Sequence, residues 1–160
     1  HPGRPAPFLV VLDGVTDPHN LGAVVRTAAS AGSSGLIVGR HRAAGLTAAA
    51  VKAAAGGVEH LPVATVAGIP NALSALAAAG VWTVALDPSA RKPVWGLEVA
   101  TEPVAIVLGA EGKGLSRLAR DRCELAVSIP MPGPIASLNV SAAAAVACFE
   151  VARSRTTQAD

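Results

Sequence analysis

The sequence predicts an α/β domain in which a mainly parallel β-sheet is covered by helices on both faces. Short apolar runs rich in β-branched residues alternate along the chain with longer segments that carry apolar residues at helical spacing. These runs are continuously apolar, as is typical of strands buried on both sides. With 160 residues, 51% of them hydrophobic and 15% charged, the chain has the size and composition of one folded domain.

The first strand and the first helix have the clearest signals. Residues 8–12 form a continuous apolar run that ends at Asp13-Gly14. Asp17 then suits a helix N-cap, and Pro18 suits the first helical position. Apolar side chains follow at a spacing that places them on one face of a helix, at Leu21, Val24, Val25, Ala28 and Ala29. Gly32 is the expected end of this helix.

The remainder of the chain repeats the same alternation. Further strands or extended segments are predicted at Gly35–Val38, His60–Val66, Val81–Leu86, Val104–Leu108 and Leu125–Ile129. Further helices are predicted at Leu46–Ala55, Asn71–Ala79, Ser116–Arg122 and from about Leu138 to Arg153. No internal repeat is visible. Strands that alternate with helices favour a parallel sheet over an antiparallel one.

Composition excludes several classes of protein. The longest apolar run, residues 142–149, is well short of the roughly 18 to 20 residues that a membrane-spanning helix needs. Cys123 and Cys148 lie far apart, without CxxC spacing or neighbouring histidines. This pattern favours reduced thiols in the core over a disulfide framework or a zinc site, so we expect no metal.

The net charge of +2 is too small for a protein that binds nucleic acid by charge alone. The chain has two tryptophans, two phenylalanines and no tyrosine, which is a poor supply of side chains for stacking on bases. If RNA is the partner, contacts with its phosphates should therefore dominate.

The ends of the chain indicate how the domain is delimited. Residues 1–7 are proline-rich and are expected to be the remnant of a linker, followed by the folded domain at 8–155 and a tail at 156–160. The sequence shows no signal peptide, and its one methionine is Met131. We therefore expect that a further N-terminal domain precedes the linker.

A glycine-rich segment, Gly109–Gly114, follows a predicted buried strand and precedes a predicted helix. Backbone N–H groups often hold a ligand in this setting. The segment reads Gly-Ala-Glu-Gly-Lys-Gly and matches neither the dinucleotide-binding fingerprint nor the P-loop. Because Glu111 would repel phosphate, the loop suits a neutral or cationic ligand better. A plain connection with a glutamate on the surface is the alternative.

Two more polar clusters are expected at the same edge of the sheet. Asn20 and Arg26 lie off the apolar stripe of the first helix, and the arginine is suited to binding phosphate. Ser137 and Asn139 follow a proline-rich loop, although either could simply cap the last helix. Together with the glycine-rich segment, these clusters are expected to form one site from distant parts of the chain.

Three segments, in this order and spacing, resemble the SpoU-type RNA ribose 2′-O-methyltransferases of the SPOUT superfamily. They are Leu12–Ala28, Val107–Leu115 and Ile129–Ser141. The resemblance spans essentially the whole chain. Within the family, the sequence is most similar to enzymes that methylate guanosine in 23S ribosomal RNA, whereas transfer-RNA and antibiotic-resistance members share the same core and stay as alternatives.

The resemblance implies a fold, a cofactor and a set of residues. The fold would include a deep trefoil knot in its C-terminal part. Backbone groups would hold S-adenosylmethionine at the positions of Leu86, Gly109, Ile129, Met131 and Leu138. The catalytic set would be Asn20, Arg26, Glu111, Ser137 and Asn139, in which the arginine orients the ribose hydroxyl rather than acting as a base. RNA would contact Arg26, Arg153 and Arg155. Members are usually cytoplasmic homodimers that need no metal and no membrane, and many carry an N-terminal RNA-binding domain.

Two functions of other kinds compete with this interpretation. A nicotinamide-dependent oxidoreductase on a Rossmann-like sheet is disfavoured, because the dinucleotide fingerprint is missing. A non-catalytic RNA-binding module would be expected to lose Arg26 or Asn139, and both are present in this chain.

Overall fold

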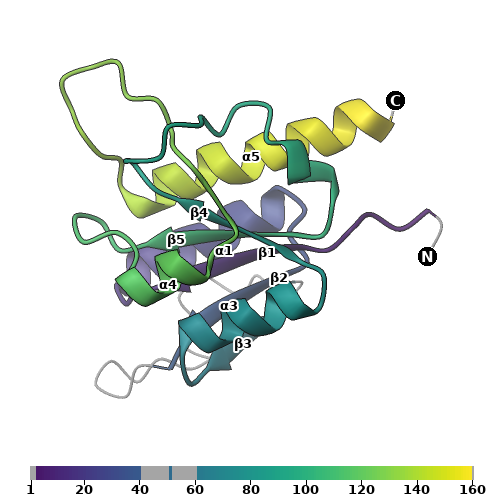
Figure 1. Ribbon diagram of the computed structural model, residues 1–160, viewed down its shortest axis with the longest axis horizontal. Coiled ribbons are helices and arrows are strands. Elements are labelled where there is room, and N and C mark those ends of the chain that lie inside the picture. Colours follow the sequence, from purple (N-terminus) through teal and green to yellow (C-terminus); the bar gives the residue numbers. More distant parts are fainter. Residues whose placement is uncertain (1–2, 41–50, 52–60, 160) are drawn as a thin grey trace.

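The computed structural model describes residues 3–40, 51 and 61–159. In this part of the chain, six strands form one parallel sheet in the order β3-β2-β1-β5-β4-β6 (Figure 1). The strands are β1 (Phe8–Asp13), β2 (Gly35–Gly39), β3 (Val63–Val66), β4 (Trp82–Leu86), β5 (Val104–Gly109) and β6 (Leu125–Val127). The predicted α/β class and parallel sheet are confirmed. Apart from Val51, which is helical, the helix predicted at 46–55 lies outside the described residues.

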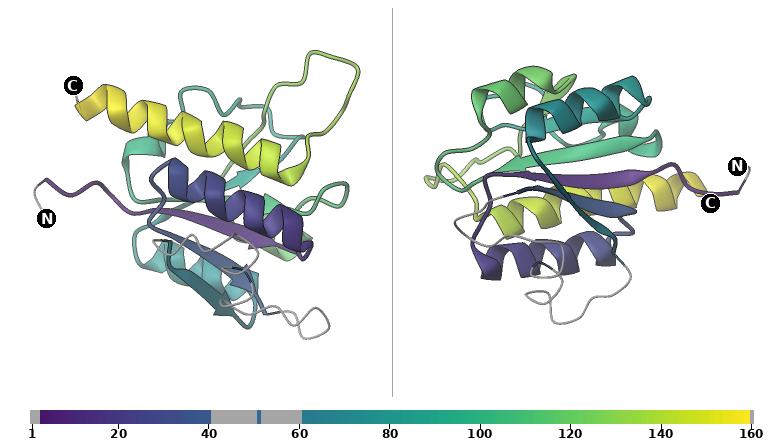
Figure 2. Two further views of the ribbon diagram at one scale, coloured as in Figure 1. Left: turned by 180° about the vertical axis from the view of Figure 1, so that it is seen from behind. Right: turned by 90° about the horizontal axis from the view of Figure 1, so that it is seen from below.

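Helices cover both faces of the sheet, as predicted. They are α1 (Pro18–Ser30), α3 (Ile69–Ala78), α4 (Arg117–Arg122) and α5 (Val140–Ala159), with a short 3₁₀ helix, η1 (Glu98–Thr101). The right-hand view of Figure 2 shows α1 and α5 on one face and α3 and α4 on the other. None of the helices in the described ranges is long and apolar enough to cross a membrane.

Local signals explain where α1 and α4 begin. The Asp17 carboxylate accepts hydrogen bonds from the backbone N–H groups of His19, at 2.8 Å, and Asn20, at 3.3 Å, so the predicted N-cap of α1 is confirmed. Ser116 caps α4 in the same way, through the N–H of Ala119. These caps fix the starts of the two helices that follow β1 and β5, the strands whose ends border the site.

The C-terminal boundaries differ from the prediction. The last helix continues to Ala159, so residues 156–159 are helical and not a tail. The preceding turns of α5 pack on the core, and a helix that is already formed extends through residues 156–159 at little cost. The last strand ends at Val127 rather than Ile129. Its pairing with β4 stops there, and the next residue, Ser128, forms an isolated β-bridge with Pro93 instead.

The core has one layer on each face of the sheet. Phe8, Val10 and Leu12 point toward α1 and α5, whereas Val11 points to the other face. All four are essentially inaccessible to solvent. Each such side chain contributes about 1.5 to 3 kcal/mol through burial, so the central strands are rigidly held. The strand ends next to the site therefore have fixed positions.

Both cysteines are free and buried. Burial raises the pKa of the Cys123 thiol to about 11 and that of the Cys148 thiol to about 12. At pH 8 only about 0.1% of the Cys123 thiol, or less, would then be the reactive thiolate. Neither thiol is poised for redox or nucleophilic chemistry.

We expect the folded protein to react slowly, if at all, with a thiol reagent such as Ellman's reagent at pH 8. Both thiols should react at once after unfolding in guanidinium chloride. Any reactivity of the folded protein should rise about tenfold with each pH unit and level off only above about pH 11, because the thiolate fraction follows this course below the pKa of Cys123. Fast labelling of the native protein at pH 8 would contradict the buried positions.

Candidate functional site

A cavity of about 490 Å³ opens at the carboxyl edge of β4 and β5. This volume lies in the usual range for small-molecule sites. Three segments enclose it: the turn after β4, the glycine-rich loop after β5, and the long connection between β6 and α5. The sheet order explains this position, because adjacent parallel strands end at one edge and their connections gather there.

All five positions expected to hold the cofactor line this cavity. Leu86 comes from the end of β4 and Gly109 from the end of β5. Ile129, Met131 and Leu138 come from the connection before α5. Positions that are up to 52 residues apart in sequence are thus brought into one lining.

The glycine-rich loop folds back tightly on itself. The N–H of Gly114 donates to the carbonyl oxygen of Ala110 at 2.7 Å. Gly112 and Gly114 have φ angles of +83° and +67°, which residues with a side chain rarely adopt. A Cβ atom on Gly109 would lie 2.1 Å from the carbonyl carbon of Gly114, so this position has no room for any side chain.

A hydrogen-bond network joins the three predicted polar clusters. The side-chain amide of Asn139 donates to Asn20 Oδ1 at 3.1 Å and to Glu111 Oε2 at 3.4 Å. Its oxygen accepts from the backbone N–H of Ser141 at 2.8 Å. Asn139 therefore caps α5 and links the other two clusters at the same time. Ser137 lies nearby in the cavity lining, together with Glu111.

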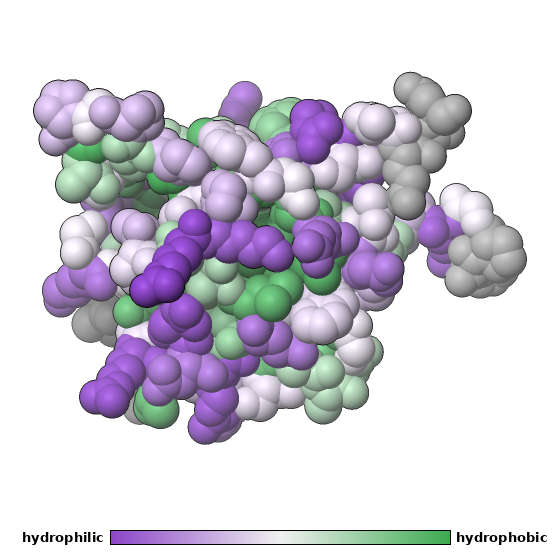
Figure 3. All heavy atoms as spheres, turned by 45° about the horizontal axis from the view of Figure 1, so that its top comes forward, coloured by the Kyte–Doolittle hydropathy of each residue, from purple (hydrophilic) through white to green (hydrophobic). Residues whose placement is uncertain are grey.

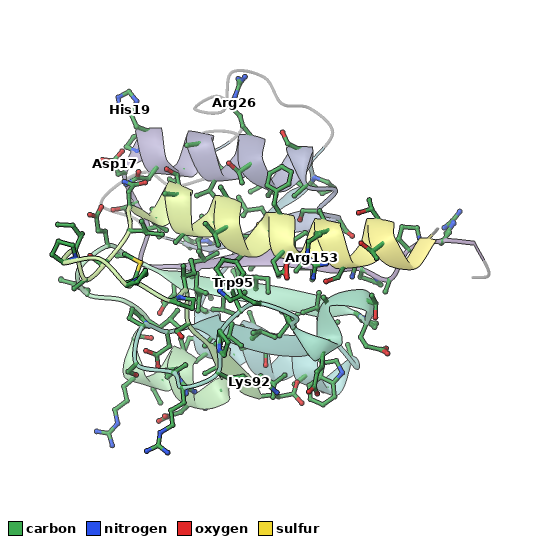
Figure 4. The ribbon with its side chains drawn as sticks, turned by 90° about the horizontal axis from the view of Figure 1, so that it is seen from above. Asp17, His19, Arg26, Lys92, Trp95 and Arg153 are labelled. Atoms are coloured by element: carbon green, nitrogen blue, oxygen red, sulfur yellow. The ribbon has the colours of Figure 1, made fainter. Side chains whose placement is uncertain are left out.

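Arg26 lies apart from this network. It is exposed on α1, six residues after Asn20, and six residues turn an α-helix by about 240°. Figure 4 shows its side chain extending outward from α1, on the side away from α5. Within one chain, the structure therefore brings together four members of the expected catalytic set and leaves Arg26 on the outer surface.

Arg153 pairs with a buried carboxylate. Glu150, only 7% exposed, accepts two hydrogen bonds of 2.8 Å from the Arg153 guanidinium and one of 3.1 Å from the N–H of Gly96. The hydrogen bonds from Arg153 lower the pKa of Glu150 below its usual range. In Figure 4, Arg153 lies on α5 beside the segment that carries Trp95. The pair holds this segment on the helix.

Arg155 is embedded in the backbone of other elements. Its guanidinium lies 5.5 Å from the centre of the Phe8 ring and donates to the carbonyl oxygens of four residues. These are Ala6, Pro7, Ala100 and Glu102. An RNA phosphate would have to compete with these partners, so the geometry favours a structural role for Arg155.

Sequence reasoning missed two charged residues of the cavity lining, Asp87 and Arg120. Arg120 Nε lies 2.9 Å from Asp87 Oδ2. Burial alone would raise the pKa of Asp87, but hydrogen bonds from Ser89 and Arg120 outweigh it and the pKa is lowered. An Asp-Pro-Ser turn directly after a predicted strand was the available signal. The described residues hold no group of three or more acidic, histidine or cysteine side chains that could bind a metal ion.

Comparison with known proteins decides the family. The sequence model of the SpoU rRNA Methylase family matches residues 7–149. The chain belongs to this family. It is 47% identical over 149 residues to the 23S rRNA (guanosine-2′-O-)-methyltransferase RlmB of Yersinia pestis, a match that covers 93% of the chain and 60% of that protein. It is 41% identical to the putative TrmH family tRNA/rRNA methyltransferase YacO of Bacillus subtilis (strain 168), covering 93% of the chain and 59% of YacO.

Solved structures of RNA methyltransferases have the same fold. An RNA 2′-O ribose methyltransferase superposes with a TM-score of 0.83 at 30% identity, over 98% of this chain and 59% of the other. The SpoU methyltransferase AviRb from Streptomyces viridochromogenes, in complex with the cofactor AdoMet, gives a TM-score of 0.79 at 30% identity, over 98% and 60%. The chain thus spans about three-fifths of the length of these relatives.

Proposed function

We propose that this chain is the catalytic domain of an S-adenosylmethionine-dependent RNA ribose 2′-O-methyltransferase that acts on guanosine in 23S ribosomal RNA. The observation that carries the proposal is the single cavity lined by all five expected cofactor positions, with the Asn20–Glu111–Asn139 network beside it. The RlmB relatives support the choice of ribosomal RNA. Action on this RNA would place the protein in the cytoplasm.

The residues present fit the cofactor. The cavity offers apolar side chains to the adenosine part and two carboxylates. That of Asp87 pairs with Arg120, whereas that of Glu111 is left to face a ligand that carries a sulfonium cation. A dinucleotide with two phosphates would meet this carboxylate unfavourably. When bound, S-adenosylmethionine supplies a methyl group that the ribose 2′-oxygen takes up, as the hydroxyl proton leaves and neutral S-adenosylhomocysteine remains.

The protein's contribution is mainly orientation. Holding two reactants in line is worth about 7 to 11 kcal/mol, whereas general-base help is worth roughly 10² to 10⁴-fold in rate, about 3 to 5 kcal/mol. Asn139 suits the first task, because its amide is held by two acceptors and its oxygen by the first turn of α5. We propose that Asn20, Glu111, Ser137 and Asn139 shape the site through hydrogen bonds. No metal is required for this chemistry.

The connection between β6 and α5 forms one wall of the cavity, and we propose that it belongs to a trefoil knot. Two contacts support this: Ser128 bridges Pro93, and the N–H of Asp87 donates to the carbonyl oxygen of Val127 at 2.8 Å. The connection is thereby held against the segment that follows β4.

We propose that α5 contributes to the interface of a homodimer. Phe149, near the middle of α5, has 48% of its surface exposed, and its neighbours on the helix include Ala145 and Ala152. Figure 3 turns this side of the molecule forward and shows apolar surface between hydrophilic side chains. Small side chains allow a second copy to approach closely.

Wild-type protein should bind S-adenosylhomocysteine in a calorimeter and should not bind NAD. Gly109→Val should abolish binding, because its Cβ would meet the backbone of Gly114 at 2.1 Å and force the loop open. Circular dichroism should show that the variant keeps its secondary structure. Absence of S-adenosylhomocysteine binding by the folded wild-type protein would refute the proposed function.

Light scattering at micromolar concentration should give twice the chain mass of 15.8 kDa. Phe149→Lys should shift the protein toward the monomer, because it places a charge in the interface. Leu118→Lys is the matched control, since Leu118 is 60% exposed on α4, on the opposite face of the sheet. A monomer mass for the wild-type protein would exclude the homodimer.

We propose that Arg26 orients the ribose hydroxyl and its neighbouring phosphate in the assembled enzyme. Arg26→Ala should lower single-turnover methyl transfer to RNA by the full-length protein by orders of magnitude, at nearly constant S-adenosylmethionine affinity. Arg26→Lys should restore little, because an ammonium lacks the planar fork of donors. Melting curves should change little, since the side chain is exposed. Near-normal turnover in Arg26→Ala would remove Arg26 from the mechanism.

A further inference from the structure

The glycine-rich loop is held from two sides by strands that flank its own strand. β5 lies between β1 and β4 in the sheet, and the loop connects β5 to α4. Asp13 is the last residue of β1, and Asp87 directly follows the last residue of β4. Each of these aspartates contacts the helix at the far end of the loop.

Asp13 holds the start of α4. In the sheet it is the partner of Gly109, where the loop begins, and its Oδ2 accepts a 2.8 Å hydrogen bond from the backbone N–H of Ser116, where the loop ends. The residues that this bond joins are 103 positions apart in sequence. Asp13 thus fixes both ends of the loop to the end of β1, the first through strand pairing and the second through its carboxylate.

Asp87 holds the middle of the same helix. Its Oδ2 accepts from Arg120 Nε at 2.9 Å. Its other oxygen, Oδ1, accepts from the backbone N–H of Ser89 at 2.9 Å and from the Ser89 hydroxyl at 2.8 Å. The Ser89 contacts fix the carboxylate, and the carboxylate fixes Arg120. Because α4 has only six residues, two such contacts restrict the whole helix.

We propose that Asp13 and Asp87 are positioning residues, which clamp α4 from both sides and so keep the loop closed on the cavity. Glu111 and the backbone of Gly109–Gly114 line the cavity, and Glu111 also accepts from Asn139. Loosening α4 would displace these groups together. The consequence for cofactor binding rests on the proposed function, whereas the clamp itself does not.

The two aspartates differ in how many acceptor atoms the clamp uses. Among the described residues, Asp13 accepts through one oxygen only, so an asparagine could replace it with its single carbonyl oxygen. Asp87 uses both oxygens, one for Ser89 and one for Arg120. An asparagine there would face one of these donors with its own NH₂ group. The amide substitution should therefore be tolerated at position 13 and harmful at position 87.

Calorimetric titration with S-adenosylhomocysteine tests this difference. Asp13→Ala, Asp87→Ala and Asp87→Asn should each weaken binding by about tenfold or more, the size expected for losing a charge-assisted hydrogen bond. Asp13→Asn should stay within about twofold of the wild type. Asp121→Ala is the matched control, because Asp121 is an exposed aspartate on the same helix and takes no part in either contact. Equal losses in Asp13→Asn and Asp13→Ala, or wild-type affinity in Asp87→Asn, would overturn the proposal.

Amide hydrogen exchange of the ligand-free proteins separates the clamp from direct ligand contact, since Asp87 and Arg120 also line the cavity. Residues 110–116 should exchange faster in Asp13→Ala and Asp87→Asn, and at the wild-type rate in Asp13→Asn and Asp121→Ala. Unchanged exchange in the first two variants would overturn the clamp. If wild-type protein failed to bind S-adenosylhomocysteine, the proposed function would fall, but the exchange rates would still decide whether the clamp exists.

Discussion

The pairing of β1 with β5 is the contact on which the site depends. These strands pair along their whole length, from Phe8 with Val104 to Asp13 with Gly109. This register places the last residue of β1 level with the first residue of the glycine-rich loop. A slip of one residue would move Phe8 and Leu12 from the core layer under α1 and α5 into the layer on the other face, so close packing in both layers fixes the register. The position of the cavity follows from that register.

The sequence predicted the parts of the fold that depend on local chemistry. Asp17 and Pro18 mark the start of α1 because a cap and a fixed φ angle act within one turn. Glu111, Asn20 and Asn139 were expected to meet, and the network between them agrees with that expectation of proximity. Proximity followed from the edge rule for parallel strands, without knowledge of the strand order.

Features that depend on tertiary contacts could not be predicted in the same way. The strand order has no signal in the sequence. The contact of Asp87 with Arg120 could not be predicted either, because it depends on β4 lying beside β5. The end of α5 was misplaced because its last turns carry no stop signal, and their helicity follows from packing. The resemblance to the SpoU family implied that Arg153 and Arg155 meet RNA. The Glu150–Arg153 pair is an i, i+3 contact within one helix, which the sequence offered, whereas the backbone carbonyls around Arg155 belong to segments 53 or more positions away.

The β1–β5 register also has a consequence for how the chain folds. The two partners lie about a hundred residues apart, so the centre of the sheet closes only after a large loop has formed. Such non-local closure lowers the folding rate relative to structures built from nearby contacts. On the ribosome, at about 5 to 20 residues per second, β1 emerges several seconds before β5 exists to cover it. During that interval the apolar side chains of β1 can be covered only by the elements that emerge soon after it, α1 and β2 among them. The nascent chain therefore depends on early packing of this first strand–helix–strand unit.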